Sequence, residues 1–254
     1  MSRTTPSVPA PAAALLVAGG RGARFGAEVP KQFLPLGGRP LFVHAAAVLD
    51  ASPCIDHWVL VVPIGWDTTA RAALAASGAD RKLAAVVAGG ATRQESVRNG
   101  LAALAAHAVA CGLGPAAQVL VQDAARPFLT PHLVEATLAA ARQTGAATVA
   151  TPVADTLVRA ATDARLLAEV LDRDGVWSVQ TPQAFSSDVL HAAHEWASVH
   201  AHQGTDDGGL VRQIGRPVAL VPGPWWNFKV TRREDFERAE LLLELRDRLR
   251  EAED

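Results

Sequence analysis

The chain has 254 residues, of which 49% are hydrophobic; this size and composition suit one large α/β domain and exclude a globally disordered protein. The formal net charge of −2 excludes a general nucleic-acid binder, and no apolar run is long enough to predict a transmembrane helix. Cys54 and Cys111 form no C-x-x-C pair, so we expect neither structural zinc nor disulfides, and a cytoplasmic location.

The predicted elements begin after a tail, residues 1–11, that is rich in proline, serine and threonine. A single domain is predicted over residues 12–254. Its strands are expected at 12–18, 57–62, 83–88, 118–122, 146–150, 217–221 and 227–230. Its helices are expected at 41–49, 66–77, 92–110, 131–143, 186–200 and from 231 onward. This alternation predicts a Rossmann-like, mainly parallel twisted sheet with helices on both faces, whose ligands bind beyond the carboxyl ends of the strands.

Glycines and basic residues follow the first predicted strand. Gly19, Gly20 and Gly22 are interleaved with arginines that include Arg24, and Lys31 comes shortly afterwards. Glycines allow successive backbone N–H groups to form an anion-binding nest, and nearby cations suit a polyphosphate. The stretch matches neither the G-x-G-x-x-G pattern nor the P-loop, so the glycines alone also allow an ordinary surface loop.

Lysine is rare in this chain. Among the 24 basic residues, lysine occurs at Lys31, Lys82 and Lys229, and the rest are arginine. Lysine is a compact point charge and arginine is a wide planar fork, so a lysine in an arginine-rich chain indicates a local requirement. We attribute such a requirement to Lys31 and Lys229, and we attribute Lys82 to chance.

Two further motifs follow predicted strands. In the G-G-A-T-R-Q-E-S-V motif, Gly90 and Ser96 flank a helix start, where backbone N–H groups favour an anion or the polar edge of a base. A plain helix capped by Thr92 is the alternative. In the V-L-V-Q-D-A-A-R-P-F motif, Asp123 ends a strand, where a carboxylate can hold Mg²⁺ against phosphates. A turn capped by Asp123 is the alternative.

The second half contains an irregular stretch and a histidine-rich helix. Residues 152–182 have no clear period, and an excursion of this length inside a domain usually has a function. His191, His194 and Glu195 do not form the H-E-x-x-H arrangement of zinc enzymes. We therefore predict that these three residues lie on a polar helix face.

The ordered motifs resemble those of one enzyme family. The segments A-G-G-x-G-x-R-x-G-x-x-x-P-K-Q, G-G-x-x-R-x-x-S-V, D-A-A-R-P, T-P-Q, T-D-D and N-F-K-V-T are similar to motifs of the cytidylyltransferases of the methylerythritol phosphate route to isoprenoids. They span residues 14–235 in the family's order. The resemblance implies a nucleotide-diphospho-sugar transferase fold. It also implies transfer of CMP from CTP to 2-C-methyl-D-erythritol 4-phosphate, with release of pyrophosphate.

The resemblance also implies roles for individual residues. The implied catalytic cations are Arg24, Lys31 and Lys229. The implied nucleotide-binding residues are Ala18, Gly19, Gly20, Gly22, Lys31, Gly90, Ser96 and Ala124. The implied acceptor-binding residues are Asp123, Arg126, Thr156, Arg173, Thr205 and Lys229. Asp123 is in addition the implied ligand of a Mg²⁺ cofactor.

The same resemblance implies a homodimer. Residues 152–182 are expected to form a protruding β-arm that clasps a second subunit, with Thr156 and Arg173 reaching the acceptor phosphate of the neighbour. After the T-D-D motif, the family usually has small residues and then a glutamate. This chain departs from that pattern at Gly208, Gly209 and Arg212.

Two other functions remain open from the sequence. A cytidylyltransferase for a pentitol phosphate, such as ribitol 5-phosphate, would share the CTP-binding half, and sequence separates the two poorly. A nucleotide-binding regulator without catalysis belongs to a different class. The charged residues Arg24, Lys31, Asp123 and Lys229 are all present, which argues against that regulator.

Overall fold

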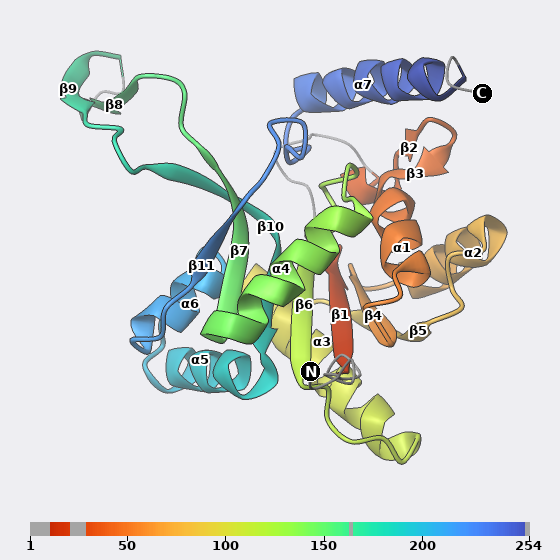
Figure 1. Cartoon of the computed structure of the whole chain (residues 1–254). Coiled ribbons are helices and arrows are strands. Elements are labelled where there is room, and N and C mark those ends of the chain that lie inside the picture. The colour runs from red at the N-terminus through yellow and green to blue at the C-terminus, as the bar shows by residue number, and fades with distance from the viewer. Residues whose placement is uncertain (1–10, 21–28, 163–164, 252–254) are drawn as a thin grey trace, which may run out of the picture.

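A computed structural model describes residues 11–20, 29–162 and 165–251, and its centre is a seven-stranded sheet (Figure 1). In spatial order the strands are β11 (Ala219–Pro222), β7 (Ala146–Pro152), β10 (Trp177–Ser186), β6 (Gln118–Asp123), β1 (Ala12–Val17), β4 (His57–Val62) and β5 (Leu83–Ala88). β10 is antiparallel to both of its neighbours, whereas the other neighbouring pairs are parallel. The predicted mainly parallel α/β fold is therefore confirmed.

Helices cover both faces of this sheet. They are α1 (Leu41–Ala51), α2 (Asp67–Ser77), α3 (Arg93–Ala110), α4 (Pro131–Thr144), α5 (Ser187–Val199) and α6 (Asp207–Gln213). The last helix, α7 (Arg233–Glu251), belongs to neither layer. One buried cluster packs α1, α2 and α4 against one face, and a second packs α3, α5 and α6 against the other. Along β1, Ala14 and Leu16 enter the first cluster while Ala13 and Leu15 enter the second, which explains the unbroken apolar run. Within the described ranges, no helix combines the length and apolar character that crossing a membrane requires.

A third, smaller cluster joins α7 to the region after β1. There the chain forms a short 3₁₀ helix η1 (Lys31–Phe33) and the hairpin β2 (Pro35–Leu36) and β3 (Arg39–Pro40). Ala239 of α7 packs with Leu36, Phe128 and Val230, all of them buried. The predicted strand at 227–230 is wrong: these residues form an irregular segment held between α7 and the sheet.

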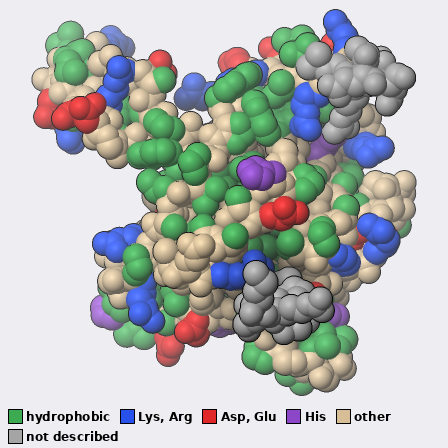
Figure 2. All heavy atoms as spheres, in the orientation of Figure 1, with side chains coloured by type: hydrophobic (Ala, Val, Ile, Leu, Met, Phe, Trp, Pro, Cys, Tyr) green, Lys and Arg blue, Asp and Glu red, His purple; other side chains and the backbone are tan. Residues whose placement is uncertain are grey.

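The irregular stretch at 152–182 contains a projecting pair of strands. β8 (Leu157–Ala160) and β9 (Leu167–Leu171) form a separate antiparallel sheet, which lies at the upper left of Figure 1, away from the seven strands. The same part of the molecule stands out as a lobe in Figure 2. The last six residues of the stretch, 177–182, belong to β10, which pairs with β7 and β6 in the main sheet. The projecting arm is thus shorter than the excursion predicted from sequence.

Candidate active site

Asp123 is the last residue of β6, at the carboxyl edge of the sheet. The residue is 7% exposed, and its carboxylate is held by two cations. Arg93 Nε donates to Oδ1 at 3.0 Å, and Lys229 Nζ donates to Oδ2 at 2.6 Å. Burial alone would raise the pKa of Asp123, but the charges of Arg93 and Lys229 outweigh it and hold the pKa well below its usual range. The carboxylate is therefore ionised at neutral pH.

The segment that carries Lys229 is fixed by the buried side chain of Asn227. Its Nδ2 donates to Gln180 Oε1 at 2.8 Å and to the Thr181 carbonyl at 2.9 Å. Thr181 Oγ1 in turn accepts from the backbone N–H of Asp123 at 3.1 Å. The T-P-Q and N-x-K motifs, 46 residues apart at Thr181 and Asn227, thus meet beside the carboxylate.

Lys31 reaches the same segment from the other side. Its Nζ donates to the Val230 carbonyl at 2.6 Å, and the Val230 N–H donates to the Ala125 carbonyl at 2.8 Å. Lys31 and Lys229, the two lysines selected from the sequence, are therefore brought together although 198 positions separate them. The third lysine, Lys82, donates instead to carbonyls of the segment after α1.

Arg126 is buried and donates hydrogen bonds to two of the segments beside Asp123. Its Nη1 donates to the Asn227 carbonyl at 2.7 Å, and its Nη2 donates to the Val179 carbonyl at 3.3 Å. Burial lowers the pKa of Arg126, and the charge of Asp123 partly offsets that effect. In this structure Arg126 therefore cross-links three segments, and its predicted contact with the acceptor stays a prediction.

Gly19, at the start of the glycine-rich stretch, lies against the G-G-x-x-R-x-x-S-V loop. A Cβ placed on Gly19 or on Gly89 would lie 2.8 Å from Ser96 Oγ and 3.3 or 3.1 Å from the Cα of the other glycine, so a side chain at either position would force Ser96 to shift. Ser96 Oγ accepts from the Gly90 N–H at 3.1 Å and donates to the Thr92 carbonyl at 2.9 Å. The described start of the glycine-rich stretch and the second loop predicted to bind the nucleotide therefore lie side by side.

The glutamine of the P-K-Q motif holds the start of the glycine loop. Gln32 is 3% exposed, and its Nε2 donates to the carbonyls of Ala18 and Gly20, the second at 2.8 Å. Ala124 is buried on the other side, where its N–H donates to the Val17 carbonyl at 3.0 Å. Gly22 and Arg24 lie outside the described residues, so their predicted roles stay predictions.

Three predicted acceptor-binding residues, Thr156, Arg173 and Thr205, are exposed to solvent. Thr156 and Arg173 are exposed at the base of the arm, where Arg173 Nη1 donates to the Ala154 carbonyl. Thr205 is exposed just before α6, and Asp206 beside it caps that helix by accepting from the Gly209 N–H at 3.0 Å. The roles of these three residues toward an acceptor stay predictions.

Three residues that were not predicted from the sequence join the site in the structure: Arg93, Asp207 and His194. Arg93 and Asp207 stand inside motifs already noted, the arginine of G-G-x-x-R and the second aspartate of T-D-D, so a signal for them existed. His194 gave no such signal. It was predicted on a polar helix face, but it is 3% exposed and bonds Asp207 Oδ1 at 2.9 Å, so that prediction is wrong for His194.

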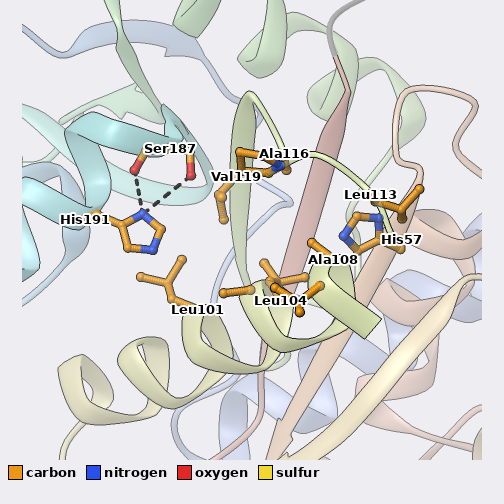
Figure 3. Close-up of a pocket in the computed structure, with 12 residues that line it drawn as sticks. His57, Leu101, Leu104, Ala108, Leu113, Ala116, Val119, Ser187 and His191 are labelled. Carbon is orange, nitrogen blue, oxygen red and sulfur yellow. Dashed lines mark hydrogen bonds between the residues drawn. The ribbon is translucent and has the colours of Figure 1, made fainter. Parts of the chain in front are cut away.

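A pocket of about 200 Å³ lies elsewhere, at the amino ends of β4 and β6 (Figure 3). Leu101, Leu104 and Val119 line it with other aliphatic side chains, and its polar members are His57, Ser187 and His191. A triphosphate site needs lysine or arginine side chains, and none lines this pocket. The pocket is therefore not the nucleotide site.

The acidic, histidine and cysteine side chains of the described residues decide which metal ions the protein could hold. Among them, no group of three or more histidine, cysteine or acidic side chains is placed so that it could hold a metal ion together. Magnesium differs, because it is often held by one or two carboxylates together with substrate phosphates. A carboxylate offers about four lone-pair positions, and Arg93 and Lys229 use two on Asp123. Asp123 therefore fits a single-carboxylate Mg²⁺ site.

Comparison with known proteins places this geometry in a family. Residues 12–245 match the family model described as IspD: 2-C-methyl-D-erythritol 4-phosphate cytidylyltransferase. Proteins of that name from Syntrophotalea carbinolica and Pelotomaculum thermopropionicum are each 42% identical, over 91% and 94% of this chain and 95% and 98% of their own. The crystal structure of the Thermus thermophilus protein of that name is 33% identical, with a TM-score of 0.72, over 91% of this chain and 98% of that one. From the site's motifs, the fold and these matches, the chain belongs to the 2-C-methyl-D-erythritol 4-phosphate cytidylyltransferase family.

Proposed function

We propose that the protein transfers CMP from CTP to 2-C-methyl-D-erythritol 4-phosphate, giving 4-diphosphocytidyl-2-C-methyl-D-erythritol and pyrophosphate. The observation that carries this proposal is the arrangement around Asp123. An ionised carboxylate, Lys229 and Lys31 lie together at the carboxyl edge of the sheet, next to two glycine-rich loops. Ligands of such sheets bind at this edge, and phosphates require cations and backbone N–H groups of this kind.

The reaction needs charge neutralisation more than proton transfer. A phosphate oxygen of the acceptor attacks the α-phosphorus of CTP, the bond to the β-phosphate oxygen breaks, and pyrophosphate leaves with that oxygen. The attacking phosphate is already an anionic nucleophile, so no general base is required. Positioning and electrostatic stabilisation then supply the rate. In this proposal Arg24, Lys31 and Lys229 stabilise the negative charge that grows on the α-phosphate.

The nucleotide and the cofactor have proposed contacts in the same place. The N–H groups after Ala18, together with Gly90 and Ser96, would bind the triphosphate, ribose and base. Asp123 would hold Mg²⁺, which neutralises phosphate charge when bound. The support from this chain is that Asp123 is ionised and keeps unused lone pairs although it is almost buried.

A homodimer formed through the arm is part of the proposal. Val158, Leu166, Leu167 and Val170 on the arm are between 47% and 65% exposed. Figure 2 shows hydrophobic side chains gathered on this lobe, beside acidic and basic ones. An isolated two-stranded sheet is marginally stable, and an exposed apolar patch usually marks an interface. A second copy covering the arm accounts for both features.

A cytoplasmic location is also part of the proposal, since both cysteines are free thiols.

Pyrophosphate release should depend on both substrates. We expect turnover with CTP and 2-C-methyl-D-erythritol 4-phosphate, and much weaker turnover when ATP, UTP or GTP replaces CTP. A coupled assay of pyrophosphate release measures turnover for each of the four nucleotides. Each nucleotide is combined with 2-C-methyl-D-erythritol 4-phosphate and, separately, with ribitol 5-phosphate. Preference for ribitol 5-phosphate would favour the pentitol enzyme. Binding of CTP without pyrophosphate release from any acceptor would favour a regulator.

Removing the metal or its ligand should stop the reaction. EDTA is expected to silence the wild-type enzyme, and excess Mg²⁺ should restore it. Asp123→Asn should require far more Mg²⁺ or lose turnover, because a neutral amide is a weak ligand for a hard cation. Mg²⁺ titrations of pyrophosphate release for both proteins measure this. Full activity of the wild type in EDTA would rule out the metal role.

A further inference from the structure

A second buried carboxylate lies beside the proposed site and has no role in the reaction as described so far. Asp207, the first residue of α6, is 1% exposed. Its Oδ2 accepts from Arg93 Nη1 at 2.7 Å, and its Oδ1 accepts from His194 Nε2 at 2.9 Å. Burial alone would raise the pKa of Asp207, but Arg93 and His194 lower it below the usual value. Asp207 is therefore an ionised group with a cation on one oxygen and an imidazole on the other.

Arg93 is shared between this carboxylate and Asp123. Nη1 points at Asp207, while Nε lies 3.0 Å from Asp123 Oδ1. Burial would lower the pKa of Arg93, but Asp207 and Asp123 raise it above its ordinary value. The guanidinium group is planar and rigid, so fixing Nη1 on one carboxylate fixes the direction in which Nε meets the other.

His194 completes the arrangement from α5. An ionised carboxylate only accepts hydrogen bonds, so Nε2 of His194 carries the proton that it donates to Asp207. His194 Nδ1 is buried and has no hydrogen-bond partner among the residues that the structure describes. The contact therefore requires one hydrogen-bond donor at the position of Nε2.

We propose that Asp207 and His194 are positioning residues that act through Arg93 on the Asp123 carboxylate. Successive contacts of 2.9, 2.7, 3.0 and 2.6 Å link His194, Asp207, Arg93, Asp123 and Lys229. Without Asp207, the fork of Arg93 would pair with both oxygens of Asp123 and compete there with Lys229. The inference rests on the proposed function, because it assigns Asp123 to the transfer reaction.

Asp50 provides a matched control. It is also 1% exposed, and it also accepts from an arginine, Arg81 Nε, at 3.0 Å. Its other donors are Trp58 Nε1 and the Lys82 N–H, so it belongs to the end of α1 and not to the Asp123 cluster. Asp50→Asn should lower thermal stability and leave turnover and the Mg²⁺ requirement as in the wild type.

The first test compares Asp207→Asn with this control in pyrophosphate release. Asp207→Asn should lower kcat by about 10- to 100-fold and raise the Mg²⁺ concentration for half-maximal rate, as loss of an orienting group does. In the free protein, the Arg93 Nε–H signal, assigned by its loss in Arg93→Lys, should exchange slowly with solvent in the wild type and quickly in Asp207→Asn. A folded Asp207→Asn with kcat within about twofold of the wild type would overturn the proposal, and so would an equal loss in Asp50→Asn.

A second test, on His194, applies if Asp207→Asn does not fold. His194→Gln retains a neutral donor near the position of Nε2 and should keep most of the turnover, whereas His194→Phe fills the space without a donor and should lose about tenfold or more. Equal kcat values for the two folded variants would overturn the role of His194. If the wild type itself releases no pyrophosphate with CTP and either acceptor, the proposed function fails instead. The two failures are therefore distinguishable.

Discussion

Replacing Lys229 or Lys31 with alanine is expected to lower turnover by about 10²–10³-fold, the usual cost of removing one transition-state donor. Lys229 Nζ lies on Asp123, and Lys31 Nζ lies on the carbonyl next to Lys229, so both charges are held where phosphate charge would develop. Initial rates of pyrophosphate release at saturating CTP and acceptor measure the loss. Circular dichroism and thermal melting check that each variant is folded.

Two further lysine variants sharpen this test. Lys229→Arg should also be poor, because a planar fork does not fit a site built around a point charge 2.6 Å from one carboxylate oxygen. Lys82→Ala is the matched control, since its Nζ donates to the carbonyls of Ser52 and Ile55, away from Asp123. Near-full turnover in both Lys31→Ala and Lys229→Ala would show that the proposed charge clamp is wrong.

Two inactive variants are expected to restore activity when they are combined. Lys31→Ala damages the core of a site, and Arg173→Ala damages the exposed arm, which the proposal assigns to the site of the partner. Refolded together in equal amounts, about half of the dimers should be mixed by random pairing in a two-fold assembly. Each mixed dimer has one site with both lesions and one with neither, so activity should return to roughly a quarter of the wild-type value.

The controls for the mixing experiment separate the arm's site role from its folding. Arg159→Ala removes an exposed arginine of the same arm, which pairs with Glu169 at 3.0 Å, and should stay active by itself. Native mass spectrometry must confirm that mixed dimers form. If mixed dimers are present and remain inactive, the arm acts on its own subunit and the shared site is excluded, while the transferase activity is unaffected.

The sequence by itself determined the layered fold and one half of the site. A short apolar run bounded by glycines, such as β1, is typical of a strand covered on two sides, and Asp123 ends a second strand of this kind. These features depend on backbone geometry and burial period, which short stretches of sequence encode.

Tertiary structure alone decided which charges meet. Lys31 and the Val230 carbonyl are 199 positions apart, and Arg93 and Asp207 are 114 apart; no local pattern encodes either pairing. The burial of His194 was likewise invisible, because the covering helix α6 was not predicted and brings Asp207 to it. A residue's periodicity tells which face of its own element it occupies. The residue that pairs with it in the folded protein comes from a distant element. Only the packing of the whole chain brings the two residues together and buries them.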